Sequence, residues 1–199
     1  MSMDSADTVR RHLLELARNA ESAAERIPDL ATRYAELVRE TLLGGGKLMY
    51  AGNGGSAAAA EHIATEYVVR LKRDRRALPA MALTASTSTM SAAANDLGYD
   101  QIFARLVEAH GQPGDLLVLH STSGNSANLL EAARVAARIG VTTVALLDRS
   151  GGQLASLVDL AIRVPADGSA SVQELQLAVE HAVADLVDDW FARDPEDDR

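Results

Sequence analysis

The chain has 199 residues, of which 47% are hydrophobic and 24% charged, as is typical of a soluble globular domain. Its net charge of -9 argues against nucleic acid as a main partner, because neutralising a row of phosphates requires clustered lysine and arginine. Since cysteine is absent, disulfides, thiol catalysis and thiolate metal sites are excluded. The first ten residues carry charges and no apolar run, and no stretch is as long as a membrane span, so we expect a cytoplasmic protein without a signal peptide.

The first 43 residues are predicted to be helical. Leu13 and Leu16 share one apolar face of a stretch over about 5–26, a proline interrupts it, and a second helix over about 29–43 ends at three glycines. Two helices before any strand need a surface for their apolar faces. We expect residues 1–45 to pack against a partner subunit, and packing on the chain's own sheet is the alternative.

From residue 47 onward, short apolar runs alternate with helical stretches. Strands that are apolar throughout and separated by helices are typical of a parallel sheet covered on both faces. We therefore predict a single domain over residues 1–199, a three-layer αβα sandwich with a five-stranded parallel sheet and a frayed tail at 193–199. The expected strands are 48–51, 80–83, 116–119, 141–147 and 160–164. The expected helices are 56–69, 87–94, 99–110, 125–139, 151–157 and 169–192.

One basic run, Arg70-Leu-Lys-Arg-Asp-Arg-Arg76, follows the first of these later helices. It is too short to indicate a nucleic-acid surface. We interpret it as a solvated helix end, where cations favour the negative end of the helix dipole.

Two strand-to-helix junctions could bind an anion. Gly52-Asn-Gly-Gly-Ser56 follows the first strand and Ser121-Thr-Ser-Gly-Asn-Ser126 follows the third. Glycines admit a ligand close to the backbone, hydroxyls donate to it, and a helix start offers unpaired N–H groups. For either loop alone, an equally good interpretation is that its residues only form a turn and cap the following helix, as Ser56 could do. Both loops emerge at the same edge of a parallel sheet, which favours one shared phosphate site.

The glycine spacing does not match the dinucleotide fingerprint, and Gly44-Gly-Gly-Lys47 precedes a strand, which excludes a P-loop.

Two helices carry residues that could bind a metal. His62 and Glu66 lie four apart and share a helix face, and Gln173 and His181 lie on the last helix. Two imidazoles, a carboxylate and an amide oxygen can make a four-ligand zinc site. Taken alone, His62 and Glu66 also fit a surface hydrogen-bonded pair, and His181 fits a satisfied helix residue.

The glycine and serine loops together resemble the sugar isomerase (SIS) domain, and more narrowly the phosphoheptose isomerase family. The similarity runs over essentially the whole chain and includes Asn95-Asp96 before Gly98 and Gly151-Gly-Gln-Leu154. That family converts sedoheptulose 7-phosphate to D-glycero-D-manno-heptose 7-phosphate. The resemblance implies substrate binding by Asn53, Gly54, Ser56, Glu66, Arg70, Asn95, Asp96, Ser121, Thr122, Ser123, Ser126 and Gln173, with the four serines around the phosphate.

The resemblance also implies a zinc-assisted reaction. Its zinc ligands would be His62, Glu66, Gln173 and His181. Aldose–ketose isomerisation through an enediol requires a base, an acid and stabilisation of an oxyanion. We expect Glu66 to be the base and His181 the acid, with zinc polarising the carbonyl and the enediolate. The resemblance implies a homotetramer with active sites between subunits.

The chain departs from the family's pattern at three positions. Ala59 stands where the family commonly has an aspartate, and Ala170 where some members have one; both aspartates would help orient the sugar or tune the metal ligands. His120 stands where it usually has an apolar residue; we expect its side chain to point away from Ser121 and assign it no role. His12 and His110 are interpreted as surface residues.

The catalytic hypothesis requires two distant helices to meet beside the serine loop. The main rival is a non-catalytic SIS-type protein that binds a sugar phosphate or regulates a protein partner. The four metal-type residues argue against this rival, and the missing aspartates argue for it. A third reading is the same chemistry on another ketose phosphate.

Overall fold

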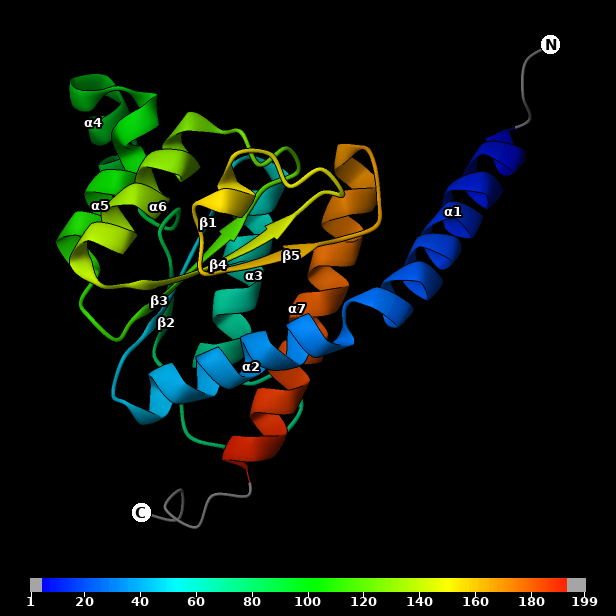
Figure 1. Cartoon of the computed structure of the whole chain (residues 1–199), viewed down its shortest axis with the longest axis horizontal. Helices are drawn as coiled ribbons and strands as arrows, with labels where there is room; N and C mark the ends of the chain where they lie inside the picture. Colours follow the sequence, from blue (N-terminus) through cyan, green and yellow to red (C-terminus); the bar gives the residue numbers. More distant parts are fainter. Residues whose placement is uncertain (1–4, 193–199) are drawn as a thin grey trace.

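Five parallel strands form one sheet in the order β2-β1-β3-β4-β5 (Figure 1). The computed structural model describes residues 5–192, so the tail predicted at 193–199 lies outside the described residues. The predicted sheet is confirmed, and each strand agrees within one residue at either end. The strands are β1 (Leu48–Gly52), β2 (Ala80–Ala82), β3 (Leu116–His120), β4 (Thr142–Leu147) and β5 (Leu160–Arg163).

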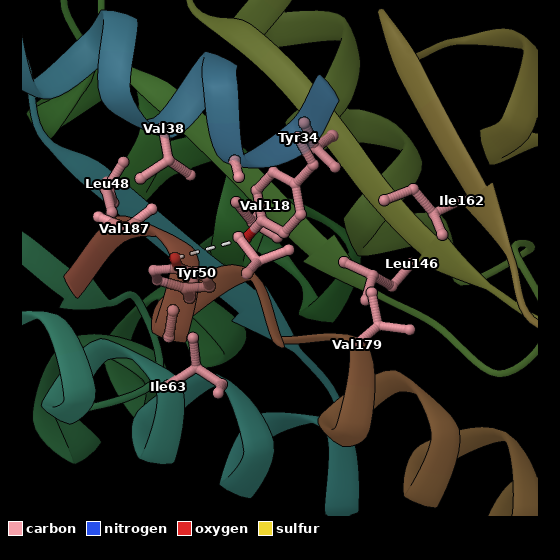
Figure 2. Close-up of a cluster of buried hydrophobic side chains, with 14 of the residues drawn as sticks. Tyr34, Val38, Leu48, Tyr50, Ile63, Val118, Leu146, Ile162, Val179 and Val187 are labelled. Atoms are coloured by element: carbon pink, nitrogen blue, oxygen red, sulfur yellow. Dashed lines mark hydrogen bonds between the residues drawn. The ribbon is translucent and has the colours of Figure 1, made fainter. Parts of the chain in front are cut away.

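Helices cover both faces of this sheet, as the apolar strands predict. One face carries α2 (Pro28–Leu43), α3 (Gly55–Val68) and α7 (Ser169–Phe191), and the other carries α4 (Thr87–Leu97), α5 (Ile102–His110) and α6 (Ala127–Ile139) (Figure 1). Successive strand residues point to opposite faces. Tyr50 and Val118 therefore lie in the first core (Figure 2), whereas their neighbours Met49 and Leu117 lie in the second.

Two predicted helices are shorter than expected. The predicted helix over 151–157 is only a 3₁₀ turn at Leu154–Ser156, because the glycines at 151 and 152 have positive φ values of 77° and 53° that break a regular helix. The helix predicted over 99–110 begins with a separate 3₁₀ turn at Tyr99–Gln101 before α5.

The two leading helices differ in their surroundings. The second, α2, buries Tyr34 and Val38 against the chain's own sheet (Figure 2), so the alternative interpretation is correct for this helix. The first, α1 (Ser5–Arg26), projects from the body of the molecule (Figure 1) and leaves Val9, Leu13 and Leu14 exposed. Among residues 5–192, no helix combines the length and hydrophobicity of a bilayer span.

The basic run at 70–76 is not a solvated helix end, and that interpretation is wrong. The helix ends at Val68, and Arg75 is buried with its Nε donating to Oδ1 of Asp188 on α7 at 2.7 Å. The other oxygen of Asp188 accepts backbone N–H groups of residues 71, 72 and 73. Burial alone would raise the pKa of Asp188, but the backbone amides of Lys72 and Arg73 and the guanidinium of Arg75 lower it below its usual value. The segment is therefore clamped to α7.

Candidate active site

The glycine loop makes a tight turn from β1 into α3. A Cβ atom on Gly52 would lie 2.6 Å from the carbonyl oxygen of Ser56, so no other residue fits there without moving backbone. Gly54 has a φ of 57° and precedes the helix, which begins at Gly55. No side-chain hydrogen bond caps this helix, so the alternative in which Ser56 caps it is wrong. Ser56 lies buried in the first helical turn instead.

The serine loop is closed by its own hydroxyls. The Oγ of Ser121 accepts the backbone N–H of Gly124 at 2.9 Å, and the Oγ of Ser123 accepts that of Asn125 at 3.2 Å. A hydroxyl that accepts in this way keeps its own proton for a further bond, for example to a phosphate oxygen. Ser126 precedes α6 at the N-cap position without a side-chain cap hydrogen bond, and Thr122 is partly exposed. The loop thus forms a turn and also presents donors.

Close packing fixes the serine loop against the turn that follows β4. Gly124 has a φ of 64°, and a Cβ atom there would lie 2.1 Å from the carbonyl oxygen of Gly151. The carbonyl oxygen of Gly124 accepts the N–H of Leu154 at 2.9 Å. The Gly151-Gly152 segment therefore supports the serine loop.

The two loops lie side by side because β1 and β3 are neighbours, with Gly52 opposite His120. The amides of Asn53 and Asn128 exchange two hydrogen bonds, of 3.0 and 2.8 Å, and the hydroxyl of Tyr99 donates to Oδ1 of Asn53 at 3.0 Å. Sequence reasoning missed Asn128 and Tyr99 as partners of this site. The only sequence signal was the polar Asn128 two residues after the serine loop.

Three of the four predicted metal ligands meet between α3 and α7. The Nε2 atoms of His62 and His181 lie 2.9 Å apart, and Nε2 of His62 lies 3.3 Å from Oε1 of Glu66. One ligand atom from each of the three residues lies within 4.8 Å of the others. The His62 side chain is 47% exposed and that of Glu66 is 18% exposed, so the group opens to solvent.

This arrangement fits a divalent metal. Two donors each 2.0–2.1 Å from a tetrahedral ion lie roughly 3.3 Å apart, close to both observed separations. Two imidazoles and a carboxylate are ligands that zinc accepts. Without a metal, one imidazole N–H can donate to the other ring.

Gln173, the fourth predicted ligand, contacts the glycine loop. Its Nε2 lies 3.4 Å from Oγ of Ser56, and a Cβ atom on Gly55 would lie 2.7 Å from its Oε1. Eight residues separate it from His181, which is about 12 Å of helix rise. In this conformation Gln173 links α7 to the glycine loop. Its side chain would have to rotate to reach the three other ligands.

The remaining predicted substrate residues lie on exposed segments. Arg70 forms an ion pair with Asp74, and Asn95 donates to Oδ1 of Asp96 at 2.7 Å on α4. Neither contact involves the group of His62, Glu66 and His181. Ala59 is partly buried on α3 and Ala170 is exposed near the start of α7, and neither supplies a carboxylate.

Two histidines without an assigned role have carboxylate partners. His120 is 1% exposed, and its Nε2 lies 2.7 Å from Oε1 of Glu180. His12 on α1 is partly exposed, and its Nε2 lies 2.8 Å from Oε1 of Glu174. His12 is therefore more than a surface residue, because it links α1 to α7. His110 is exposed, as expected.

Comparisons with known proteins identify the family of this chain. Residues 12–148 match the family model described as the SIS domain. A phosphoheptose isomerase from Chlorobaculum parvum is 45% identical over 185 residues, which cover 92% of this chain and 88% of that protein. Two solved structures superpose closely. A phosphoheptose isomerase, GmhA, from Neisseria gonorrhoeae has a TM-score of 0.89 and 36% identity, and one from Francisella tularensis has 0.91 and 32%. Each comparison covers 94% of this chain and 100% of the other.

Proposed function

The chain belongs to the phosphoheptose isomerases of the SIS domain family, and we propose that it converts sedoheptulose 7-phosphate to D-glycero-D-manno-heptose 7-phosphate through an enediol. The observation that carries this proposal is the meeting of His62, Glu66 and His181 from two helices, in a chain whose glycine and serine loops follow neighbouring strands. A phosphate anchor and a proton-transfer group are what this reaction requires.

The phosphate of the substrate is proposed to bind Ser56, Ser121, Ser123 and Ser126. Small hydroxyl side chains and the N–H groups at the starts of α3 and α6 can surround an anion without a lysine. Asn53, Gly54 and Thr122 border the same place on the two loops. Arg70, Asn95 and Asp96 are proposed to reach the sugar.

Glu66 is proposed to move the carbon-bound proton. Its carboxylate removes a proton from C1 of the ketose while the oxygen on C2 gains one, which yields the enediol. The same carboxylic acid then returns its proton to C2 while the oxygen on C1 loses one, and the aldose forms. Protons balance, and no oxidant is consumed.

His181 is proposed to serve the oxygens, giving a proton to the oxygen on C2 and taking one from the oxygen on C1. Its Nε2 faces His62. A ring nitrogen that binds a metal carries no proton, so with Nε2 of His181 ligating, the transferred proton would be carried by Nδ1.

His62, Glu66, Gln173 and His181 would hold a zinc ion. When bound, such an ion would polarise the carbonyl and stabilise the enediolate charge. Glu66 has two oxygens, so one can ligate while the other receives the proton.

The chain is proposed to form a homotetramer with active sites between subunits. In support, α1 leaves Val9, Leu13 and Leu14 exposed. An apolar groove between α1, α2 and α7 is lined by Ala20, Ala24, Ile27, Leu175 and Ala182, among other residues. Light scattering on the purified protein should give about four times the 21.1 kDa chain mass.

Ala59 and Ala170 favour a second candidate, a sugar-phosphate-binding protein that regulates a partner and does not catalyse. This candidate predicts that the ketose phosphate binds without conversion. The isomerase predicts both binding and conversion.

The deciding experiment incubates the protein with sedoheptulose 7-phosphate, with and without zinc, and follows formation of the aldose phosphate. Turnover that rises with zinc and is inhibited competitively by inorganic phosphate is expected. Binding without any turnover in the presence of zinc would overturn the isomerase and leave the regulator.

A further inference from the structure

A carboxylate and an imidazole are buried together between α7 and the end of β3. Glu180 on α7 is 0% exposed, and its Oε1 lies 2.7 Å from Nε2 of His120 at the end of β3. The hydroxyl of Tyr34 donates to the other oxygen of Glu180 at 3.0 Å. The hydroxyl of Tyr50 lies 3.4 Å from that of Tyr34 (Figure 2). The network joins β3, α7, α2 and β1.

Stability alone does not explain this network. Well-packed apolar side chains fill a core as well as a buried charged pair does, and they often do so with higher stability. In addition, Nδ1 of His120 is buried with no hydrogen-bond partner among the described residues. An unpartnered buried nitrogen destabilises the folded state. The pair therefore calls for another role.

Its place in the chain indicates that role. His120 is the residue before Ser121, which opens the serine loop, and Glu180 is the residue before His181. Consecutive Cα atoms are a fixed distance apart, about 3.8 Å. The contact between His120 and Glu180 therefore links the start of the serine loop to the position of His181.

Other polar residues on α7 make contacts of the same kind. Gln176, one turn before Glu180, donates to the carbonyl oxygens of Ser121 at 3.1 Å and Leu146 at 2.8 Å. Gln173, a further turn away, contacts Ser56. The spacing of three and four residues places these side chains on one face of the helix, toward the strand ends. Of the three contacts, the one made by Glu180 lies closest in sequence to the group of His62, Glu66 and His181.

We propose that His120 and Glu180 are positioning residues that set the distance between the serine loop and His181. The inference rests on the proposed function, in which a substrate held by its phosphate presents C1 and C2 to Glu66 and His181. Neither positioning residue touches the substrate. A misplacement of about 1 Å far from the chemistry can slow a reaction by about a hundredfold, so a contact that holds this distance acts on turnover.

The test replaces both partners in the full-length protein, His120→Leu with Glu180→Leu, so that neither group is left buried alone. We expect the urea midpoint of unfolding to stay equal or rise. We expect kcat for sedoheptulose 7-phosphate to fall about tenfold or more. The KM should change by less than about twofold because the serines remain. Amide hydrogens of residues 121–126 should exchange faster than in the wild type.

Two further variants separate positioning from core packing. Glu180→Gln keeps a hydrogen-bonding group of the same length, and it should retain most of the wild-type kcat. Tyr50→Phe keeps the ring that packs against His120 and removes a buried hydroxyl that contacts Tyr34 and neither member of the pair. It should match the wild type in kcat and in exchange at 121–126.

A folded double variant with wild-type kcat, or with unchanged exchange at 121–126, would overturn the proposal. If the wild type does not isomerise sedoheptulose 7-phosphate, the proposed function fails, and exchange at 121–126 alone then decides whether the pair positions the loop.

Discussion

The Nε2 atoms of His62 and His181 lie 2.9 Å apart, although 119 residues separate them in the sequence. One histidine comes from the helix after the glycine loop and the other from the last helix. With Glu66 they form a group of ligand atoms within 4.8 Å of one another. Two adjacent imidazole nitrogens and a carboxylate are ligands that a divalent metal such as zinc accepts.

Removal of either histidine should weaken metal binding. Loss of a supporting hydrogen bond to a metal ligand lowers affinity 10–100-fold, so loss of a ligand in His62→Ala or His181→Ala should cost at least about a hundredfold. Zinc titration followed by calorimetry checks this. His110→Ala, an exposed histidine at the end of α5, is the matched control and should bind like the wild type. Equal affinity in all three variants would contradict a metal site at this place.

Replacement of Glu66 should abolish proton transfer and leave the fold intact. We expect Glu66→Gln to lower kcat by about 10²–10⁴-fold, the usual contribution of a general base. Glu61→Gln changes an exposed carboxylate on the same helix and should keep the wild-type rate. Steady-state assays on sedoheptulose 7-phosphate measure both. A wild-type rate in Glu66→Gln would remove Glu66 from the mechanism.

Gly55→Ala should separate activity from stability. The added Cβ would lie 2.7 Å from Oε1 of Gln173, whose side chain can move away at the expense of the site. Gly55 is helical, so alanine should raise the free energy of unfolding by up to about 1 kcal/mol. We expect kcat/KM to fall about tenfold in a protein that is at least as stable.

Gly52→Ala is the contrasting variant, because its Cβ would lie 2.6 Å from the backbone carbonyl oxygen of Ser56. Unlike a side chain, the backbone cannot move away without a loss of stability. Urea unfolding should show a clear loss of stability for Gly52→Ala and none for Gly55→Ala. Equal behaviour of the two glycine variants would show that Gln173 is not held as the structure describes.

Asp188→Asn should destabilise the protein in a pH-dependent way. Because the pKa of Asp188 is lowered in the folded state, its stabilisation is present above the unfolded value of about 3.9 and is lost as pH falls through the folded value. At pH 7 the variant leaves Arg75 buried without a charged partner, a loss of about 3 kcal/mol. The difference in the free energy of unfolding between the variant and the wild type, measured with urea, should shrink below about pH 4.

Asp185→Asn is the control for this experiment. Asp185 lies one turn earlier on α7 and pairs with Lys72 at a largely exposed position. Such pairs contribute less than about 1 kcal/mol. If Asp185→Asn lowered the free energy of unfolding as much as Asp188→Asn, the buried contact of Asp188 with Arg75 would not be the cause of the destabilisation.

Tyr34→Phe should change the alkaline stability of the protein. Burial, together with the nearby charge of Glu180, raises the pKa of Tyr34 well above the ordinary phenol value. A raised pKa contributes stability that is complete below the unfolded value of about 10 and is lost as pH rises toward the folded value. Above about pH 10 the free energy of unfolding should fall less steeply with pH in the variant than in the wild type. The two slopes should differ by about 1.4 kcal/mol per pH unit. Equal slopes of unfolding free energy against pH in the two proteins would contradict a raised pKa of Tyr34.

Local patterns were sufficient for the elements and the loops. Apolar runs separated by amphipathic stretches predicted the five strands to within a residue, because strand and helix periodicity are properties of short segments. The prediction was poorer where glycines with positive φ reduced the helix over 151–157 to one turn. The same local reasoning gave the wrong environment for Arg75. A short basic run looks the same in the sequence whether it is solvated or buried, and only the distant Asp188 shows that Arg75 is buried in an ion pair.

The sequence by itself determined the chain's architecture, the positions of the glycine and serine loops between strand and helix, and the face shared by His62 and Glu66, since each depends on residues within a few positions of one another. Only the tertiary structure decided that His181 meets His62, that Gln173 contacts Ser56 and that His120 is paired with Glu180. These partners lie on α7 and on elements far from it in sequence. Their contact depends on strand order and helix packing across the whole sheet, which no local periodicity encodes.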